Sequence, residues 1–524
     1  MVPADYFQLA DKAGGVELLP AWFKQHWTDP QRGDEEWNFY LSGQYVCLGE
    51  VTPAAIVRKD DLSDGIKNAL ATSRPQSPEW LGALHALVDE LDGITMEFTD
   101  YDRLRFNGPV SRDTLINDVR AQYPMPALST RRATAMRPVT LAAAGDVLIN
   151  RPYPGEVFSS AGPLLGAADI AFGNFEGVLT DTHVAMPGAS IAAIAGTANA
   201  APLSAFSVLS LANNHAMDAG YGGLSDTVET LAKANVAAVG AGQGLTAALA
   251  PHVAEREGLR VAILAVTAVF AMGTQAREGF PGIAPLRAED CWAPSSPGIY
   301  TPGVPPRILS ILDERDWEHL EHAIASARER ADIVVVSAHW GDHTRPWVLT
   351  EHERLCAELL AGAGVDLVLG HHQHMLRGVE FVDGTPVFYG LGHLAFDMPR
   401  YGDELRSRGI DVDAMTARER AEQLGEFGIY PRPETPAFPF ASMARNSAIA
   451  IVEMGSEGIA RCGMAPFAID SAGIPRAVSR GDQAWAGAVS FLRTCAERAH
   501  LSSAAADTGW THAGYDIIEW VDGP

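Results

Sequence analysis

The stretch Val365-Asp-Leu-Val-Leu-Gly-His-His-Gln-His374 joins a short apolar run directly to a segment with three histidines. The run is typical of a buried strand, because it is short, aliphatic and closed by glycine. A second stretch has the same build, since the apolar run 206–211 leads into Ala212-Asn-Asn-His-Ala-Met-Asp218. Strand ends in an α/β sheet are where side chains converge on a ligand. Imidazole, amide and carboxylate groups placed there bind divalent transition metals, so we predict a metal site on a layered α/β fold.

Strand-like and helix-like segments alternate from Val139 onward. The expected strands are 139–144, 169–173, 206–211, 236–239, 261–266, 333–336, 365–369, 386–389 and 448–452. Helices are expected at 225–234, 317–331 and 351–363, where apolar residues recur on one face. This alternation predicts an α/β domain with a largely buried sheet.

Composition also suggests how the chain is divided. Residues 1–125 carry no catalytic pattern, and we expect an N-terminal module of unknown role there. Residues 126–138 contain prolines and small polar residues without apolar periodicity, which predicts a linker before a catalytic domain at 139–524. Within that domain, the polar, proline-rich segment 397–440 is expected to be an insertion or a lid near the active site.

Charge and cysteine content exclude several classes of protein. The chain has 524 residues and a formal net charge of -26, and its Lys and Arg residues form no basic stripe. We therefore expect neither nucleic acid nor an anionic membrane as a partner. The five cysteines are far apart without a CxxC pair, which disfavours a cysteine metal site and fits a reducing compartment. We see no secretory signal and no apolar run that reaches the roughly 20 residues of a membrane span, and so expect a soluble cytoplasmic protein.

Five strand exits each offer oxygen or imidazole groups. In chain order the candidates are Asp146, Glu176, Asn214, His215, His339, His372 and His374. Each has a structural explanation when taken alone: an aspartate after glycine caps a turn, Asn213-Asn214 forms a left-handed turn, and a single buried histidine hydrogen-bonds in a core. Their recurrence at successive strand ends favours a metal site.

These segments together resemble the CapA family, which is associated with poly-γ-glutamate capsule synthesis and belongs to the calcineurin-like metallophosphoesterase superfamily. The segments that carry the resemblance are 145–151, 168–177, 211–218, 337–341 and 370–374. The resemblance implies a four-layer α/β/β/α sandwich with metals at the sheet edge, preceded here by an extra N-terminal region.

The resemblance also implies a role for each candidate residue. Asn214 corresponds to the metal-binding asparagine of an Asn-His motif, and His215 to the adjacent histidine that does acid–base or charge-stabilising work. The other implied ligands are Asp146 on the first strand, the isolated His339, and the pair His372 and His374, one for each metal of a binuclear site. The implied cofactor is one or two divalent ions such as Mn or Zn. Asp218, three residues after His215, is placed to hold the other nitrogen of that ring.

Two departures from the family pattern affect the site. The superfamily has Asp-x-His at the first strand, but Asp146 is followed by Val147-Leu148, so one metal position loses a ligand and Glu176 is the candidate replacement. Where CapA relatives read Leu-Gly-Asn-Phe, this chain reads Leu391-Gly-His-Leu394. His393 is therefore a further catalytic candidate, with a packing role as the alternative.

Three functions remain open from the sequence. The first is metal-dependent hydrolysis of an amide or phosphoester in a peptide, poly-glutamate or small-molecule substrate. The second is epimerisation of a ribosomal peptide by Cα proton exchange, as in some members of the family, with His215 as one base and His393 or His339 as the other. The third is a non-catalytic assembly factor for a capsule or polymer. Serine-hydrolase and P-loop chemistry are excluded, because neither G-x-S-x-G nor G-x-x-x-x-G-K-[ST] occurs.

Overall fold

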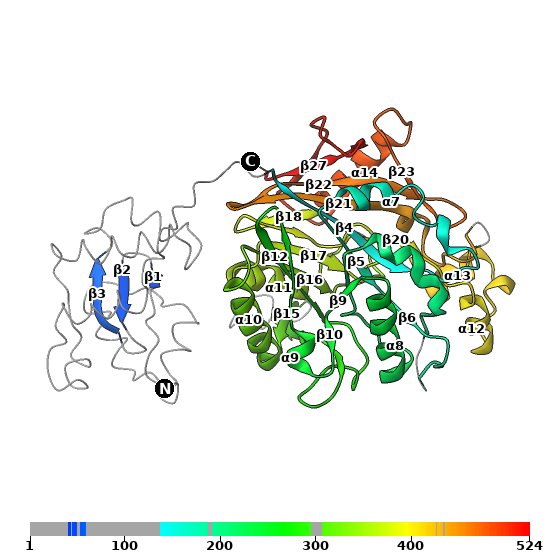
Figure 1. Ribbon diagram of the computed structural model, residues 1–524, viewed down its shortest axis with the longest axis horizontal. Helices are drawn as coiled ribbons and strands as arrows, with labels where there is room; N and C mark the ends of the chain where they lie inside the picture. The colour runs from blue at the N-terminus through cyan, green and yellow to red at the C-terminus, as the bar shows by residue number, and fades with distance from the viewer. Residues whose placement is uncertain are drawn as a thin grey trace. The chain divides into compact units, whose positions relative to one another are not determined.

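The computed structural model describes residues 137–186, 191–294, 306–425, 427–432 and 435–523, together with the backbone of three earlier strands. These strands are β1 (Tyr40–Ser42), β2 (Tyr45–Gly49) and β3 (Pro53–Arg58), which pair antiparallel in that order (Figure 1). The chain divides into two compact units, 1–133 and 134–524. The rest of the module predicted at 1–125, and most of the linker predicted at 126–138, lie outside the described residues.

The second unit is built on two large sheets. The larger sheet has ten strands. Its main order is β24 (Ala504–Ala506), β27 (Ile518–Val521), β22 (Gly458–Ile469), β21 (Asn446–Gly455), β4 (Val139–Leu148), β5 (Ile170–Phe175), β8 (Val208–Ser210) and β9 (Ala237–Val239). Two more strands join it, β20 (His393–Phe396) beside β4 and β23 (Pro475–Ala477) beside β22. Because β4, β5, β8 and β9 run parallel, their carboxyl ends share one edge.

The smaller sheet has six strands. Its order is β11 (His252–Arg256), β12 (Leu259–Thr267), β16 (Ile333–His339), β17 (Leu367–His371), β19 (Thr385–Phe388) and β18 (Val379–Val382). The strands β12, β16, β17 and β19 are parallel. This sheet therefore also has one edge at which several strands end together.

The two sheets pack face to face. This is shown by successive residues along a strand, which are buried in two different cores. On β12, Val261 and Ile263 share one buried core with Leu141 and Phe172 of the larger sheet. The residues that alternate with them, Ala262 and Leu264, point the other way into a second core. Since successive strand residues face opposite sides, each sheet is buried on both faces.

Helices cover the two outer faces (Figure 1). On the smaller sheet lie α10 (Glu314–Arg328) and α11 (Glu351–Gly362), which pack through their apolar sides. On the larger sheet lie α7 (Gly162–Ala167) and α8 (Gly220–Lys233). The α11 helix begins at a capping box between Thr350 and Glu353, which satisfies its first backbone N–H groups. The predicted helix–sheet–sheet–helix sandwich is confirmed.

The remaining elements connect these layers. They are η3 (Pro154–Glu156), β6 (Val178–Leu179), β7 (Ile194–Ala195), η4 (Thr197–Ala205), β10 (Ala241–Gly242), α9 (Leu245–Ala248), β13 (Gly282–Ile283), β14 (Ala288–Ala293), β15 (Arg307–Leu312), α12 (Tyr401–Ser407), η5 (Val412–Ala414), α13 (Ala417–Leu424), η6 (Ser442–Arg445), α14 (Trp485–Arg498), β25 (Thr511–His512) and β26 (Tyr515–Asp516). The segment 397–440 thus contains helices. It is fixed at its start by the buried Asp397, whose carboxylate accepts a 2.7 Å hydrogen bond from Nε of Arg151.

Two glycines allow strands to meet closely at the functional edge. A Cβ on Gly145 would lie 2.1 Å from the carbonyl oxygen of Gly392, and one on Gly370 would lie 2.0 Å from that of Tyr389. Both distances are far inside van der Waals contact, so only glycine fits. Each glycine precedes a buried polar residue of the functional site, Asp146 or His371, whose position depends on this close approach.

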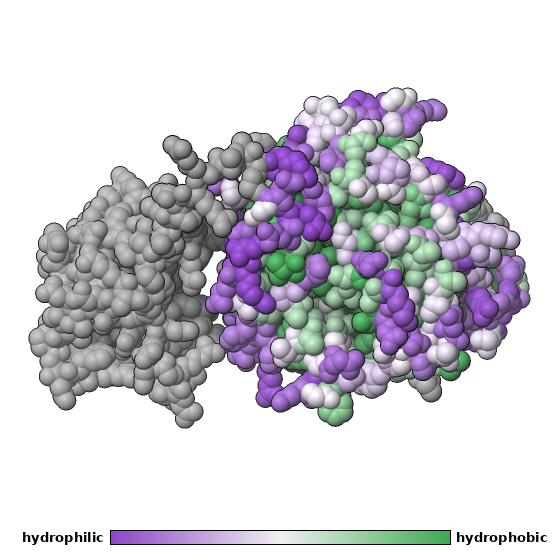
Figure 2. Space-filling view, in the orientation of Figure 1, coloured by the Kyte–Doolittle hydropathy of each residue, from purple (hydrophilic) through white to green (hydrophobic). Residues whose placement is uncertain are grey.

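The surface of the second unit is mixed in character. Figure 2 shows hydrophilic residues over much of one face, with hydrophobic patches between them. Within the described part of the chain, no helix combines the length and the hydrophobicity needed to cross a membrane.

Candidate metal centre

The predicted ligands converge where the strands of the two sheets end. Asp146 lies within β4, Glu176 follows β5, and Asn214 follows β8. From the smaller sheet, His339 ends β16, while His372 and His374 follow β17. All of these except Asn214 are buried, and Asn214 is half-buried. Their side chains form two clusters of potential ligands.

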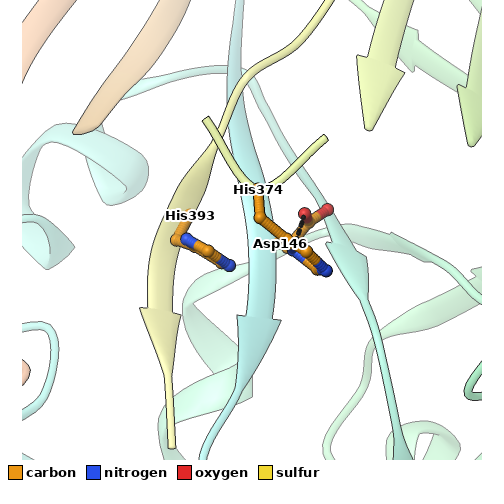
Figure 3. Close-up of side chains that lie close together, drawn as sticks. All are labelled: Asp146, His374 and His393. Atoms are coloured by element: carbon orange, nitrogen blue, oxygen red, sulfur yellow. Dashed lines mark ion pairs between the residues drawn. The ribbon is translucent and has the colours of Figure 1, made fainter. Parts of the chain in front are cut away.

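The first cluster contains Asp146, His374 and His393 (Figure 3). Each offers a ligand atom, and these atoms lie within 4.8 Å of one another. Nδ1 of His374 lies 3.2 Å from Oδ2 of Asp146. His393 is the register partner of Asp146 on β20, and its ring stacks on that of His374 with centroids 4.8 Å apart. A single ion fits among these three groups.

The second cluster contains Glu176, His339 and His372, again with ligand atoms within 4.8 Å of one another. Nε2 of His339 lies 3.6 Å from Oε1 of Glu176 and 2.7 Å from Oδ1 of Asn214, so the amide adds an oxygen to this cluster. Oε1 of Glu176 is also 3.8 Å from Nε2 of His374, a member of the first cluster. Glu176 therefore lies between the two clusters.

Several atoms in these clusters lack the hydrogen-bond partners that buried polar groups need. No hydrogen bond within the described structure reaches Oδ2 of Asp146, either carboxylate oxygen of Glu176, either ring nitrogen of His393, or Nδ1 of His372 and His374. Burying such groups unpaired is costly, and a cation that accepts their lone pairs removes the cost. The donor set of carboxylate oxygen, amide oxygen and imidazole nitrogen fits a divalent ion such as Mn or Zn.

Burial and neighbouring charges set the protonation states of the clusters. Burial lowers the pKa of His339, His372 and His393 well below the ordinary value of 6.5, which keeps these rings neutral, as metal binding requires. Although burial alone would raise it, the nearby imidazoles hold the pKa of Asp146 well below its usual range. Burial and the charge of Asp146 raise the pKa of Glu176 well above its usual range, and a nearby cation would stabilise its ionised form.

The histidine loop after β17 is held in an unfavourable backbone conformation. The φ angles of His372 and His374 are 92° and 57°, in the left-handed region that bulky residues avoid. Such positions cost about 1–3 kcal/mol each and persist only where the surroundings impose them. Between the two residues, Nε2 of Gln373 donates 2.8 Å hydrogen bonds to Glu353 and to the carbonyl of Tyr389. Gln373 thus fixes the turn that aims both imidazoles into the centre.

The side chains of Asn214 and His215 diverge. Asn214 points to His339, while Nδ1 of His215 lies 2.8 Å from Oδ2 of Asp218. That carboxylate is itself held by the backbone N–H of Ala193 at 2.7 Å. The contact leaves Nε2 of the half-buried His215 as the ring nitrogen that can meet a substrate.

His393 is placed differently from the catalytic role considered for it. It is fully buried, and the rings of Phe440 and Phe438 cover it at centroid distances of 4.1 Å and 5.2 Å. A side chain in that position is closed to a substrate but lies within ligand distance of Asp146. Its geometry favours metal binding over direct catalysis.

The sequence analysis passed over three residues of the site. Nδ1 of His371 lies 3.3 Å from Oδ1 of Asp146, and Nδ2 of Asn174 donates to the same oxygen at 2.9 Å. His343, in the loop after β16, has its ring 5.3 Å from that of His372. Their positions at or after strand ends were the available signal. Burial and the charge of His374 lower the pKa of His343 to about 4.

The sequence is similar to that of capsule synthesis proteins. Residues 140–398 match the family described as bacterial capsule synthesis protein PGA_cap, and residues 19–124 match a family of unknown function, DUF6058. PGA biosynthesis protein CapA of Bacillus subtilis (strain 168) is 31% identical over 254 residues, covering 46% of this chain and 57% of that protein. Capsule biosynthesis protein CapA of Bacillus anthracis is 28% identical over 272 residues, or 49% of this chain and 60% of that protein. The chain therefore spans less than two thirds of either relative.

Two solved structures show weaker likeness. A hypothetical protein from Thermus thermophilus has a TM-score of 0.35 and 15% identity, over 63% of this chain and 98% of that one. GAP50, the anchor in the inner membrane complex of Plasmodium, has a TM-score of 0.28 and 11% identity, over 64% of this chain and 85% of that one.

The segment 140–398, which matches the capsule synthesis family, contains every member of both ligand clusters, as well as His215 and Asp218.

Proposed function

The chain belongs to the CapA family of bacterial capsule synthesis proteins, and we propose that it is a divalent-metal-dependent enzyme that hydrolyses an amide or phosphoester bond, in a peptide or poly-glutamate substrate. The observation that carries the proposal is the pair of buried clusters around Asp146 and Glu176, in which several potential ligand atoms have no hydrogen-bond partner within the described structure. Two adjacent ions are an arrangement suited to hydrolysis.

Each of the two clusters would bind one ion. Asp146, His374 and His393 would hold one ion, and Glu176, His339 and His372 the other, with Asn214 as an additional oxygen. When bound, such ions polarise a carbonyl or phosphoryl oxygen and lower the pKa of water to about 7. Neither cluster contains a cysteine, so the thiolate sites typical of structural zinc do not apply.

His215 is the proposed acid–base residue. The carboxylate of Asp218 fixes its Nδ1, so the ring is oriented and Nε2 is the atom that holds or moves a proton. A purely structural metal site has no need of this pair, which argues for an enzyme over a non-catalytic assembly factor.

Epimerisation remains the second candidate, and the placement of the bases ranks it below hydrolysis. It needs two bases that exchange one Cα proton, and the sequence offered His393 or His339 as the partner of His215. Both lie in the ligand clusters, and His393 is fully buried. Of the other imidazoles at the centre, His371 is fully buried against Asp146 and His343 is half-buried, so an epimerase would require His343 as its second base.

Metal analysis tests the centre itself. Protein purified with Mn or Zn should carry bound metal by elemental analysis, and the double variant His339→Ala/His372→Ala should lose the ion of the second cluster. Equal metal content in the two proteins would overturn the assignment.

Product analysis tests the reaction. Metal-loaded protein is incubated in heavy water with γ-glutamyl and α-linked peptides and with bis(p-nitrophenyl) phosphate. Hydrolysis adds the mass of water across a cleaved bond, whereas epimerisation leaves the chain intact and introduces one Cα deuterium. Metal-bound protein with neither activity on any of these probes would favour the assembly role.

A further inference from the structure

A pocket opens beside the first ligand cluster. It holds about 210 Å³ of empty space, part of which is open to solvent. Two imidazoles, those of His374 and His343, form its metal side. The other walls are Met375, Phe427, Ile429 and Phe440, together with two alanines. Because this volume includes open solvent, the pocket has room for one side chain at most.

The pocket adjoins the metal centre through one shared residue. His374 is both a candidate ligand and part of the wall, and the ring of Phe440 packs on it with centroids 4.6 Å apart. A group bound in the pocket would therefore lie next to the substrate bond that is positioned at the metal ions. It would belong to the same residue of the substrate as the reacting carbonyl, or to its neighbour.

The chemistry of the walls selects the occupant. No Lys or Arg is among the described residues that line the pocket, and most of its walls are aliphatic or aromatic. A carboxylate placed there would lose its water without gaining a cation, which is costly. An apolar side chain gains instead, at about 25 cal/mol for each Å² removed from water.

We propose that this pocket receives an apolar side chain of a peptide substrate, adjacent to the bond that reacts. The proposal rests on the proposed metal-dependent function and narrows its substrate class. It favours peptides with a residue such as leucine or phenylalanine over poly-γ-glutamate, in which every residue carries a carboxylate. Phe427, Ile429 and Phe440 all come from the segment 397–440, so this segment would set the specificity.

Metal-binding hydroxamates provide a test that does not require turnover. The probes are acetohydroxamate, which has no side chain, and the N-acetyl α-hydroxamates of leucine, glutamine and glutamate. Their affinities for the Mn-loaded full chain are measured by calorimetry. The glutamine probe separates polarity from the repulsion of an anion by a chain with a net charge of -26. We expect the leucine probe to bind about tenfold or more tightly than the glutamine probe, because a well-filled apolar pocket discriminates by that order.

Two variants localise the preference. Phe427→Ala removes one wall and Ala441→Leu fills the pocket, and each should abolish most of the preference for leucine while leaving acetohydroxamate affinity unchanged. Ile311→Ala, an apolar truncation at an exposed position on β15, is the matched control and should keep the preference. Equal affinity for leucine and glutamine, or a preference that survives both pocket variants, would overturn the pocket proposal alone. Failure of the wild type to bind acetohydroxamate would overturn the metal centre and the pocket proposal with it.

Discussion

Asp146 and His393 are register partners on the adjacent parallel strands β4 and β20, and both side chains are fully buried in one ligand cluster. The sequence around Asp146 lacks the histidine that the superfamily places two residues later. His393 brings an imidazole to the same aspartate from a neighbouring strand. An imidazole from a neighbouring strand thus takes the place of the missing histidine, so that each cluster has at least three potential ligands.

Replacing His393 should cost one of the two ions. We expect His393→Asn, which restores the asparagine of CapA relatives, to weaken the metal at the Asp146 cluster and leave the ion at the Glu176 cluster in place. Elemental analysis would give the number of bound ions, and a Mn titration monitored by electron paramagnetic resonance would give their affinities. His343→Asn is the matched control, since His343 lies in neither cluster, and should retain both ions. Unchanged metal content in His393→Asn would mean that His393 is a packing residue.

Removing His215 should separate catalysis from metal binding. His215→Ala should keep its metal, because the residue contacts Asp218 and belongs to neither cluster. Its rate should fall by about 10²–10⁴, the usual contribution of a positioned acid or base. His339→Ala should lose the ion of the Glu176 cluster together with the activity. Full activity in His215→Ala would place the acid–base group elsewhere, with His343 the next residue to test.

Asp218 should act through His215. Asp218→Asn keeps the shape of the side chain but replaces the carboxylate that holds Nδ1 of His215, so the rate should fall while the metal content stays unchanged, and adding this change to His215→Ala should cost no further rate. A double variant that is slower than His215→Ala alone would indicate that Asp218 acts separately, by holding the backbone N–H of Ala193.

The close approach at Gly145 should be essential for folding. Gly145→Ala would force its Cβ to within 2.1 Å of the carbonyl oxygen of Gly392 and separate β4 from β20. We expect a loss of several kcal/mol or failure to fold, as for other severe backbone clashes. Gly487→Ala, inside α14 with nothing within 4 Å of the added carbon, is the matched control. It should be neutral or stabilise by about 0.5–1 kcal/mol, because alanine is the better helix former. Equal melting temperatures for the two variants would contradict this account.

Local patterns in the sequence were enough to predict most of the sheet. The buried runs at 139–144, 333–336 and 365–369 appear as β4, β16 and β17, because a strand buried on both faces is a continuous apolar run. Each strand extends further at its carboxyl end than predicted, and the added residues include Asp146, His339 and His371. Polar character marked these residues as loop, whereas the ladder continues through them.

Long-range pairing accounts for what the sequence did not reveal. His393 reaches Asp146 only because β20 adds to the larger sheet beside β4, and nothing in the residues around either position encodes that neighbour. The segment 397–440 was read as an irregular excursion because of its prolines, yet α13 begins at a capping box formed by Thr416 and Glu419. The pocket walls contributed by this segment likewise depend on tertiary packing.

Away from the metal centre, His352 should make the protein sensitive to acid. Its ring is buried against Trp340, and burial lowers the pKa of His352 from 6.5 to about 4. The unfolded chain therefore binds a proton more readily than the folded protein, so the stability that depends on the neutral ring is complete above pH 6.5 and is lost as the pH falls towards 4. Integration of this difference gives a decrease of about 2 kcal/mol in the free energy of unfolding between pH 7 and pH 5.

His352→Phe, which keeps an aromatic ring but cannot be protonated, tests this prediction. In urea unfolding, its free energy of unfolding should decrease by that much less between the two pH values. His319→Phe, at an exposed position on α10, should behave as the wild type does, because its surroundings change little on unfolding. An identical pH dependence in wild type and His352→Phe would show that the buried ring is not protonated on unfolding in this range.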